Sequence, residues 1–456
     1  MFEPLSYYLI PTGLVVLAAP LLLRLSSSRK EHQQHPLASA PSSPAMPHTI
    51  VILGAGVAGV PLAHHLLKHT PPSVADIRVV LVAPNSDLLW PFATVRAILP
   101  DQLADDKIFL PLAPAFARYG RRFAHVLGSA VRVDPDAREV VVARTSDTTA
   151  AQEEVLRYDT LVVATGSAFR DAMPFKNHGG TPETKALLHT WQAAVADAKD
   201  IVVAGAGLTG IEVAGELGQV YALPGNKTVT LLAAEDLPLS ADVRADVRRA
   251  AARELAKVGV RFRGGVRVVA STTSSAAAGD AEGVTSPGKT TLTLRATDGT
   301  TSTLATDLYL PALGVRANTS FLPPTLLAAD GRVAVRPTLQ TVARPDIFAV
   351  GDVADIESPQ GIHADKQVQF LATALQSRLA GLAAPKGAGP APALPEYKPD
   401  HGVAFGATIG PKRGAGQMAG WKIFGFLVAY IKGRYLGTDY APNFIAGERT
   451  LTKKSW

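Results

Sequence analysis

The stretch Thr49-Ile-Val-Ile-Leu-Gly54-Ala-Gly-Val-Ala-Gly59 decides the fold of this 456-residue sequence. Its first five residues form a continuous apolar run, which is typical of a parallel strand buried on both faces. The glycines that follow have the spacing GxGxxG, and residues 60–67 then predict a helix. Gly54 would allow the tight turn, Gly56 would let the backbone approach a pyrophosphate, and Gly59 would let the helix pack closely on the strand. The stretch therefore predicts a dinucleotide-binding βαβ unit with phosphates at the helix N-terminus.

The same arrangement of strand, glycines and helix occurs a second time. Ile201-Val-Val-Ala204 predicts a strand, Gly205-Ala-Gly-Leu-Thr-Gly210 repeats the GxGxxG spacing, and residues 211–220 predict a helix. One GxGxxG is weak evidence in a sequence so rich in glycine and alanine, but two copies in this context argue against chance. Two nucleotide sites in one chain predict a bound flavin together with a nicotinamide cofactor that diffuses in and out.

Two further strand ends lie between and after the glycine motifs. Residues 158–164 predict a strand that leads into Thr165-Gly166, and residues 346–350 predict another that leads into Gly351-Asp352. The order GxGxxG, ATG, GxGxxG, GD resembles that of flavoproteins with two dinucleotide-binding domains, over residues 49–379. Within them, the strings MPFKNHGGTPETKALLH, GLTGIEVAGELG, GQMAGWK and KGRYLGTDYAP resemble the fungal branch of the apoptosis-inducing-factor-like flavoproteins, which are related to the ferroptosis suppressor and to type II NADH dehydrogenases.

This resemblance implies an α/β fold with two Rossmann-like dinucleotide-binding domains and a small C-terminal segment. The NAD(P)H-binding domain, residues 171–314, would be inserted into an FAD-binding domain formed by residues 48–170 and 315–383. Residues 384–456 would form a segment on the membrane and acceptor side. The resemblance also implies noncovalent FAD, NADH or NADPH as hydride donor to flavin N5, and a membrane quinone as acceptor.

By position, the resemblance assigns FAD contacts to Arg96, to the backbone of Ala130, and to Asp352, which would hydrogen-bond the ribityl chain. Glu212 would face the nicotinamide, and residues 365–367 would precede a helix whose positive N-terminal end points at the flavin. Ordinary alternatives are an exposed helix residue for Arg96 and a helix cap for Asp352. The predicted cofactor-binding residues are Gly54, Ala55, Gly56, Val57, Ala58, Gly59, Arg96, Ala130, Thr165, Gly166, Gly205, Gly207, Gly210, Glu212, Asp352, Lys366 and Gln367.

Both units lack the acidic residue that usually follows the second strand and binds the adenosine ribose. The corresponding residues are Val-Ala-Pro at 82–84 and Leu-Ala-Ala at 232–234. In the nicotinamide unit this removes the usual repulsion of a 2′-phosphate, so NADPH is admissible, with Arg244 or Arg248 as its partner. The choice between NADH and NADPH stays open.

The sequence contains no cysteine, which excludes disulfides, thiolate metal sites and a redox-active dithiol. We expect neither a metal site nor a catalytic side chain, because the flavin carries the chemistry. Residues 421–432 combine aromatic, aliphatic and basic residues, which suits a helix lying at a lipid surface; a helix packed on the protein core is the alternative. Gln417, Tyr430 and Lys432 are the predicted acceptor-side residues. Two functions compete with quinone reduction. One is reduction of a soluble electron carrier, and the other is an effector role with slow NAD(P)H oxidation.

The N-terminal region predicts membrane attachment. Residues 5–23 form an uncharged stretch whose length is close to that of a membrane-spanning helix. Basic residues follow this stretch. Residues 1–25 are therefore predicted to anchor the chain, by a spanning helix or by monotopic insertion, with 26–47 as a flexible linker and the catalytic part facing the cytosol. The mitochondrial outer membrane and the lipid droplet both fit. Phe2 excludes the myristate that requires Gly at this position, and a start at Met46 would omit the anchor.

The formal net charge is +6 and spreads along the chain. No basic run is interleaved with aromatic residues, so we do not expect nucleic-acid binding. The oligomeric state stays open. A run of Ser, Thr, Ala and Gly at residues 271–290 predicts an insertion in a loop between two strands.

Overall fold

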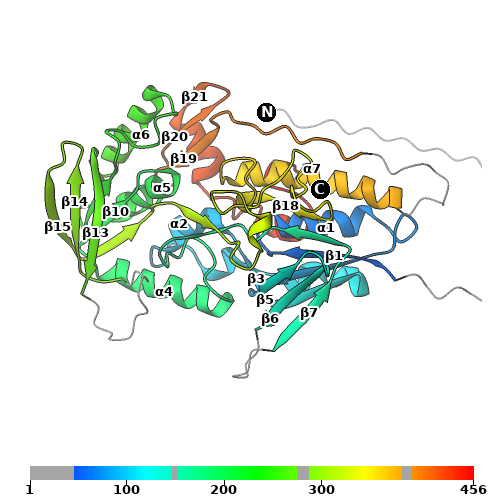
Figure 1. Ribbon diagram of the computed structural model, residues 1–456. Coiled ribbons are helices and arrows are strands. Elements are labelled where there is room, and N and C mark those ends of the chain that lie inside the picture. Colours follow the sequence, from blue (N-terminus) through cyan, green and yellow to red (C-terminus); the bar gives the residue numbers. More distant parts are fainter. Residues whose placement is uncertain (1–45, 146–151, 275–286, 383–392) are drawn as a thin grey trace, which may run out of the picture. The chain divides into compact units, whose positions relative to one another are not determined.

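The computed structural model describes residues 46–145, 152–274, 287–382 and 393–456. The predicted anchor and all but the last two residues of the predicted linker lie outside these ranges. In the described part of the chain, no helix is both long enough and apolar enough to cross a bilayer. The α/β fold class predicted from the sequence is confirmed, with two parallel sheets that each carry one of the glycine motifs (Figure 1).

The first sheet has seven strands in the order β18-β8-β1-β2-β5-β6-β7. Its first five strands are parallel, and β6 and β7 continue it as an antiparallel extension. The helix α1 follows β1 through the glycine turn, and α7 follows β18 after a longer connection that contains the 3₁₀ turn Gly351–Val353. The bounds are β1 His48–Leu53, α1 Gly59–His69, β2 Ile77–Ala83, β5 Phe123–Asp134, β6 Glu139–Arg144, β7 Glu153–Arg157, β8 Thr160–Val163, β18 Ile347–Ala349 and α7 Gly361–Leu382.

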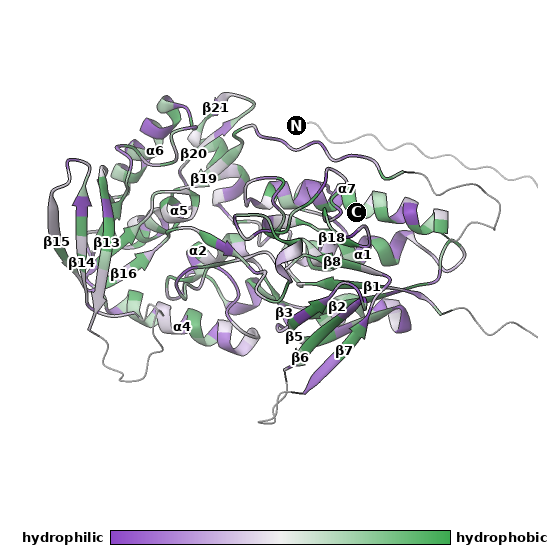
Figure 2. Cartoon of the chain, in the orientation of Figure 1, coloured by the Kyte–Doolittle hydropathy of each residue, from purple (hydrophilic) through white to green (hydrophobic). Residues whose placement is uncertain are grey.

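Both faces of the central parallel strands of this sheet are buried, as the continuous apolar run of β1 predicts. Ile50 and Ile52 belong to the core on the helix side, whereas Val51 and Leu53 belong to the core on the opposite side. Successive side chains of a strand point to opposite faces, so only a strand covered on both sides reads as apolar throughout. The hydrophobic colour of β1, β2 and β8 in Figure 2 follows from this double burial.

The second sheet is parallel, with the order β12-β11-β10-β16. Helices α4, α5 and α6 belong to this part of the chain, and the antiparallel sheet β13-β14-β15 shares a small core with β10 and β11. The bounds are α4 Thr181–Asp197, β10 Asp200–Ala204, α5 Leu208–Leu217, β11 Thr228–Leu232, α6 Ala245–Lys257, β12 Arg261–Arg263, β13 Val266–Thr273, β14 Thr290–Ala296, β15 Thr301–Thr306 and β16 Leu308–Pro311. The insertion predicted at residues 271–290 joins β13 to β14, and its residues 275–286 lie outside the described ranges.

The chain passes between the two sheets through a pair of short strands. β9, Ser167–Phe169, leaves the first sheet, and β17, Val315–Ala317, returns to it, and the two pair in antiparallel fashion. Thr165 and Asn318 reinforce this crossing, because the Thr165 hydroxyl donates to Asn318 O at 2.7 Å and Asn318 Nδ2 donates to Thr165 O at 2.9 Å. The second glycine motif thus sits in an insertion within the first unit.

The C-terminal segment differs from the prediction of one helix over residues 421–432. Residues Trp421–Ile423 form strand β21, and the helix α8, Gly425–Val428, continues as a π-helical turn over Ala429–Gly433. β21 forms a hairpin with β20, Gly414–Met418, through Ala419 and Gly420, whose φ angles are +49° and +77°. Two successive positive φ values are the signature of a tight hairpin turn, and that turn overrides the local helical pattern. The remaining bounds are β19 Phe405–Thr408 and α9 Ala441–Ile445.

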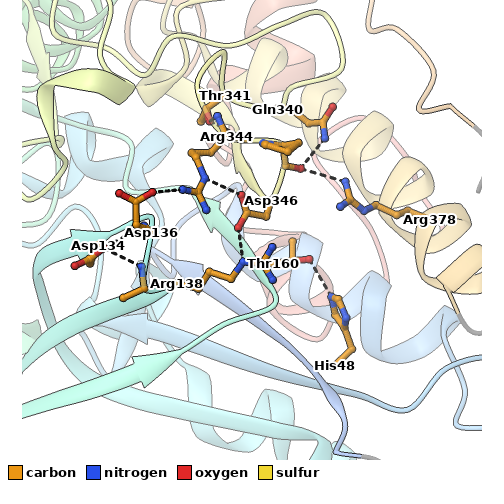
Figure 3. A network of polar contacts seen from close by, with 12 residues as sticks. His48, Asp134, Asp136, Arg138, Thr160, Gln340, Thr341, Arg344, Asp346 and Arg378 are labelled. Atoms are coloured by element: carbon orange, nitrogen blue, oxygen red, sulfur yellow. Dashed lines mark hydrogen bonds and ion pairs between the residues drawn. The ribbon is translucent and has the colours of Figure 1, made fainter.

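A polar network closes the end of the first sheet that lies opposite the glycine turns (Figure 3). Arg344 lies between Asp136 and the buried Asp346, at 2.6 and 3.3 Å, and Arg138 contacts Asp346 at 3.0 Å. Arg344 and Asp346 precede β18 at the amino ends of the parallel strands, and Asp136 and Arg138 lie in the turn between β5 and β6. Because ligands bind at the carboxyl ends of parallel strands, this network has a structural role and the opposite edge carries the site.

Candidate dinucleotide and electron-transfer site

The first glycine motif has the geometry of a cofactor cradle. Gly54 has a φ of +108°, and a Cβ there would lie 2.3 Å from Ala164 O; a Cβ on Gly59 would lie 1.9 Å from Gly54 O. At Gly56, by contrast, a Cβ would meet no atom of the protein within 4 Å. Two glycines are therefore required by the packing of the turn itself, while the middle one leaves open space where a pyrophosphate needs close approach to the backbone. The residues present fit the FAD phosphates.

The second glycine motif repeats this geometry. Gly205 has a φ of +98°, and a Cβ there would lie 2.4 Å from Ala312 O; a Cβ on Gly210 would lie 1.7 Å from Gly205 O. Gly207 again faces open space and caps the N-terminus of α5. The backbone N–H groups at that end of the helix are free to bind a second pyrophosphate.

The Gly-Asp turn after β18 meets the turn after β8. Oδ2 of Asp352 accepts hydrogen bonds from the Ser167 hydroxyl at 2.7 Å and from Lys176 Nζ at 2.6 Å. Its Oδ1 makes no hydrogen bond with any residue that the structure describes, so one carboxylate oxygen remains for the predicted ribityl contact. The alternative that Asp352 caps the following helix is wrong, because Asp352 lies in a 3₁₀ turn and α7 begins only at Gly361.

Lys366 and Gln367 lie inside α7, whereas we expected them before the helix. The first helical hydrogen bond runs from Ala364 N to Gln360 O at 3.0 Å, which places both residues in the second turn. Gln367 Oε1 accepts a hydrogen bond from Gly351 N at 2.8 Å and so stabilises the Gly-Asp turn. Lys366 pairs with Asp400 at 2.8 Å. Their direct contact with a cofactor stays a prediction.

Arg96 connects three parts of the molecule. It lies on the short helix α2, Thr94–Ala97, and binds the buried carboxylate of Glu216 on α5 through Nε and Nη2, at 2.9 and 2.7 Å. Nη2 and Nη1 also donate to the carbonyl oxygens of Gly433 and Arg434, at 2.7 and 3.0 Å. Four of its five N–H groups are thus used within the protein, which leaves one for the predicted contact with FAD. The alternative of an exposed helix residue is wrong, since the side chain is only 12% exposed.

Glu212, predicted to face the nicotinamide, is buried in the first turns of α5. Its Oε1 accepts from Lys432 Nζ at 2.6 Å, from Thr408 N at 3.0 Å and from the Thr408 hydroxyl at 3.2 Å. Lys432 belongs to the π-helical turn and Thr408 to β19. The structure therefore brings together a predicted nicotinamide-site residue and a predicted acceptor-side residue that are far apart in the sequence. Their catalytic roles stay predictions.

The other predicted residues are not among the hydrogen-bond partners found for the side chains of Glu212 and Lys432 in the described ranges. Gln417 on β20 is buried and accepts from Arg244 N at 3.0 Å, while Tyr430 is 77% exposed. Ala130 lies on β5 at a β-bulge opposite β6. Of the two candidates for a 2′-phosphate, Arg248 is occupied with the carbonyl oxygens of residues 237 and 238, and Arg244 pairs with its neighbour Asp246 on the surface. The donor preference therefore stays open.

A cavity of about 350 Å³ opens beside the second glycine motif. One wall contains Gly207 and Leu208 together with Leu239, Ser240, Asp242 and Val243; the opposite wall contains residues at the start of α7 and residues 400–405. Sequence reasoning did not predict the residues of the opposite wall, among them His363 and Asp400. No local sequence motif identifies these residues as part of a site, because the cavity forms only when three segments that are distant in the sequence come together in the fold.

The C-terminal segment exposes eight large apolar side chains between residues 418 and 435. Trp421, Phe426 and Ile431 are 78%, 71% and 72% exposed, although each lies in an ordered element or next to one. Val428, on the other face of α8, is buried against the glycines of β19 and β20. We call the exposed group the C-terminal apolar patch; it comprises Met418, Trp421, Phe424, Phe426, Leu427, Tyr430, Ile431 and Tyr435.

The sequence model of the pyridine nucleotide-disulphide oxidoreductase family matches residues 48–377. The chain belongs to this family. It is 35% identical to oxidoreductase ptaL of Pestalotiopsis fici over 401 residues, which covers 87% of this chain and 98% of that protein. It is 25% identical to ferroptosis suppressor protein 1 of Taeniopygia guttata over 402 residues, covering 85% and 93%. The fold is similar to that of NDH2 from Plasmodium falciparum in complex with NADH, with a TM-score of 0.65 at 11% identity over 87% of this chain and 98% of that chain.

These findings confirm the resemblance stated from the sequence. The protein is a pyridine nucleotide-dependent flavoprotein oxidoreductase, with FAD and NAD(P)H as its cofactors. FAD, when bound, supplies the hydride and electron chemistry, and the chain supplies two phosphate cradles, a cavity and the charges around them. The disulfide chemistry in the family's name is not open to these 456 residues, since they include no cysteine.

Proposed function

We propose that the protein is an NAD(P)H:quinone oxidoreductase that works at a lipid surface. Without a thiol of its own to receive electrons, the chain must deliver them directly from flavin to an outside acceptor. The C-terminal apolar patch is the observation that carries the proposal. The C-terminal apolar patch concentrates large exposed aromatic and aliphatic side chains in one short segment, which marks an interaction site, and Trp and Tyr favour the interface between water and lipid.

The charges near the patch favour a membrane with anionic lipids as its partner. Lys412, Lys422 and Arg434 are exposed on the same C-terminal segment, so this segment offers both apolar and basic side chains to a lipid surface. The patch is also continuous with the predicted acceptor side, because Lys432 extends from the same π-helical turn to Glu212 on α5. A quinone entering from lipid would therefore arrive next to the second glycine motif's helix.

Attachment through residues 1–25, a catalytic part that faces the cytosol, and residence on the mitochondrial outer membrane or lipid droplets belong to the same proposal. The anchor would hold the chain at the membrane, and the patch would orient the electron-transfer site towards it. A short-chain quinone that is soluble in water should then react without lipid, whereas a long-chain quinone should need the patch.

Anaerobic stopped-flow absorbance near 450 nm tests the reaction. Mixing the protein with NADH or NADPH should bleach the flavin, and a short-chain ubiquinone should then restore the absorbance. Bleaching that a soluble electron-transfer protein reverses and quinone does not would replace this proposal with the competing reductase function. A long-lived reduced state that neither acceptor reoxidises would favour the effector function.

Replacing Trp421, Phe426 and Ile431 together by serine tests the patch. We expect the variant to reduce long-chain ubiquinone in vesicles containing phosphatidylserine at least about tenfold more slowly, because much of the apolar area that binds lipid is lost. Its rate with a short-chain quinone should stay unchanged. Serine at Val155 and Val342, each 54% exposed elsewhere on the surface, provides the matched control. Equal rates of the two variants on vesicles would contradict the lipid proposal.

A further inference from the structure

Two helix N-termini open into the cavity beside the second glycine motif. One wall includes Gly207 and Leu208 at the start of α5, and the other includes Gln360 and His363 at the start of α7. The pyrophosphate of NAD(P)H belongs at the α5 end, where the glycine motif leaves room for it. The nicotinamide half must leave that end to reach the flavin, and the cavity leads it to the wall formed by the first turn of α7.

His363 is held in one orientation on that wall. The residue is only 4% exposed, and its Nδ1 lies 3.0 Å from Ser358 O and 3.3 Å from the Ser358 hydroxyl. A carbonyl oxygen can only accept, so Nδ1 carries the hydrogen, and Nε2 of the neutral ring is left with a free lone pair. Nε2 makes no hydrogen bond with any residue in the described ranges, although the residue lines the cavity. The ring is buried and fixed through Nδ1, so its Nε2 can accept a hydrogen bond from a ligand in the cavity.

We propose that His363 is a positioning residue for the nicotinamide half of NAD(P)H. Its Nε2 accepts a hydrogen bond from a donor of that half, either a ribose hydroxyl or the carboxamide N–H. Ser358 fixes the ring from behind, and the α7 backbone fixes its position relative to α5. The inference rests on the NAD(P)H site that the family establishes and not on the proposed quinone, so the two can fail separately.

Two substitutions at His363 separate the two ring nitrogens. In His363→Asn the amide nitrogen can replace Nδ1 and donate to Ser358 O, but nothing replaces Nε2. In His363→Gln the longer amide places its oxygen near the position of Nε2 and can accept the same hydrogen bond. His189→Gln is the matched control, since that histidine is exposed and pairs with Asp105, which does not line the cavity.

The reductive half-reaction provides the measurement, because it needs no acceptor. Holoenzyme with full FAD content is mixed anaerobically with increasing NADH, and then NADPH, and the bleaching rates give a dissociation constant and a limiting rate for each variant. We expect His363→Asn to weaken NAD(P)H binding about tenfold, the effect of one lost hydrogen bond, with thermal stability as in the wild type. His363→Gln should recover binding to within about twofold, and His189→Gln should match the wild type.

Wild-type affinity in His363→Asn would overturn the proposal. Equal loss in the Asn and Gln variants, accompanied by lower thermal stability, would also overturn it, by showing a role only in folding. A protein that NAD(P)H bleaches normally but that no quinone reoxidises would refute the proposed function and leave the role of His363 standing.

Discussion

A Cβ on Gly59 or Gly210 would lie 1.9 or 1.7 Å from a backbone oxygen of its own turn, whereas one on Gly56 or Gly207 would meet nothing within 4 Å. Glycines of one motif therefore serve different purposes. The outer ones let the helix pack on its strand, and the middle one leaves room for phosphate. The spacing alone predicted these roles, because the turn after a parallel strand has one steric solution.

Alanine substitutions should separate these purposes. Gly56→Ala should fold normally but retain little FAD, since the methyl group occupies the space of the pyrophosphate. Gly207→Ala should keep its FAD and lose NAD(P)H affinity at least about tenfold, because hydrogen bonds to a charged phosphate contribute roughly 1.5–3 kcal/mol each. Flavin absorbance per protein and the dissociation constant of NADH measure the two effects.

Gly59→Ala is the comparison for both variants. A Cβ at that position meets backbone, which cannot move aside, so this variant should not fold to a stable protein. If Gly56→Ala instead keeps wild-type FAD content, the assignment of the first motif to FAD is wrong.

The helix α1 shows how an element's partners change the chemistry of its side chains. His64 and His65 both lie on α1 and are buried, His64 beneath Tyr119 and the carbonyl of Ile445 from α9. Burial lowers the pKa of His64 to about 3 and that of His65 to about 4. The sequence predicts the helix but not these pKa values, because the covering residues come from the distant C-terminal segment.

Stability should therefore decrease in mild acid. The unfolded chain has the ordinary His pKa of 6.5, so it takes up protons before the folded chain does as the pH falls. The contribution of His64 is complete above pH 6.5 and is lost progressively down to about pH 3, with about 2 kcal/mol gone at pH 5. Melting temperatures between pH 7 and 5 measure this effect.

His64→Gln should reduce that pH dependence by the share of His64, because the amide can still hydrogen-bond but does not titrate, while His65 keeps its own share. His189→Gln, at an exposed position, should leave the dependence as in the wild type. A slope that is identical in all three proteins would contradict the assignment to His64.

At the scale of the whole molecule, the ion pair of Arg96 and Glu216 joins the FAD unit, the inserted unit and the C-terminal segment. Burial raises the pKa of Glu216, although Arg96 opposes the shift. The desolvation of this carboxylate thus outweighs the attraction of its partner. Such a pair fixes the arrangement of three segments without adding much net stability.

Removing one partner should be far more harmful than removing both. Arg96→Met leaves an uncompensated buried carboxylate, so we expect a loss of about 3–5 kcal/mol, visible as a lower melting temperature. Combining it with Glu216→Leu should restore most of that loss, because both groups are then apolar. A double variant as unstable as Arg96→Met would show that the pair is itself a main source of stability.

The sequence by itself determined the two glycine motifs, the strands that precede them and the family to which they belong. Each of these depends on neighbours within one βαβ unit, where local sterics and the burial of a strand leave little choice. Only the tertiary structure decided that residues 421–423 form a strand, that Arg96 binds Glu216, that Lys432 reaches Glu212 and that His363 lines the cavity. These features join segments that are up to hundreds of residues apart in the sequence. A local sequence pattern does not indicate which distant residue will contact it in the folded protein.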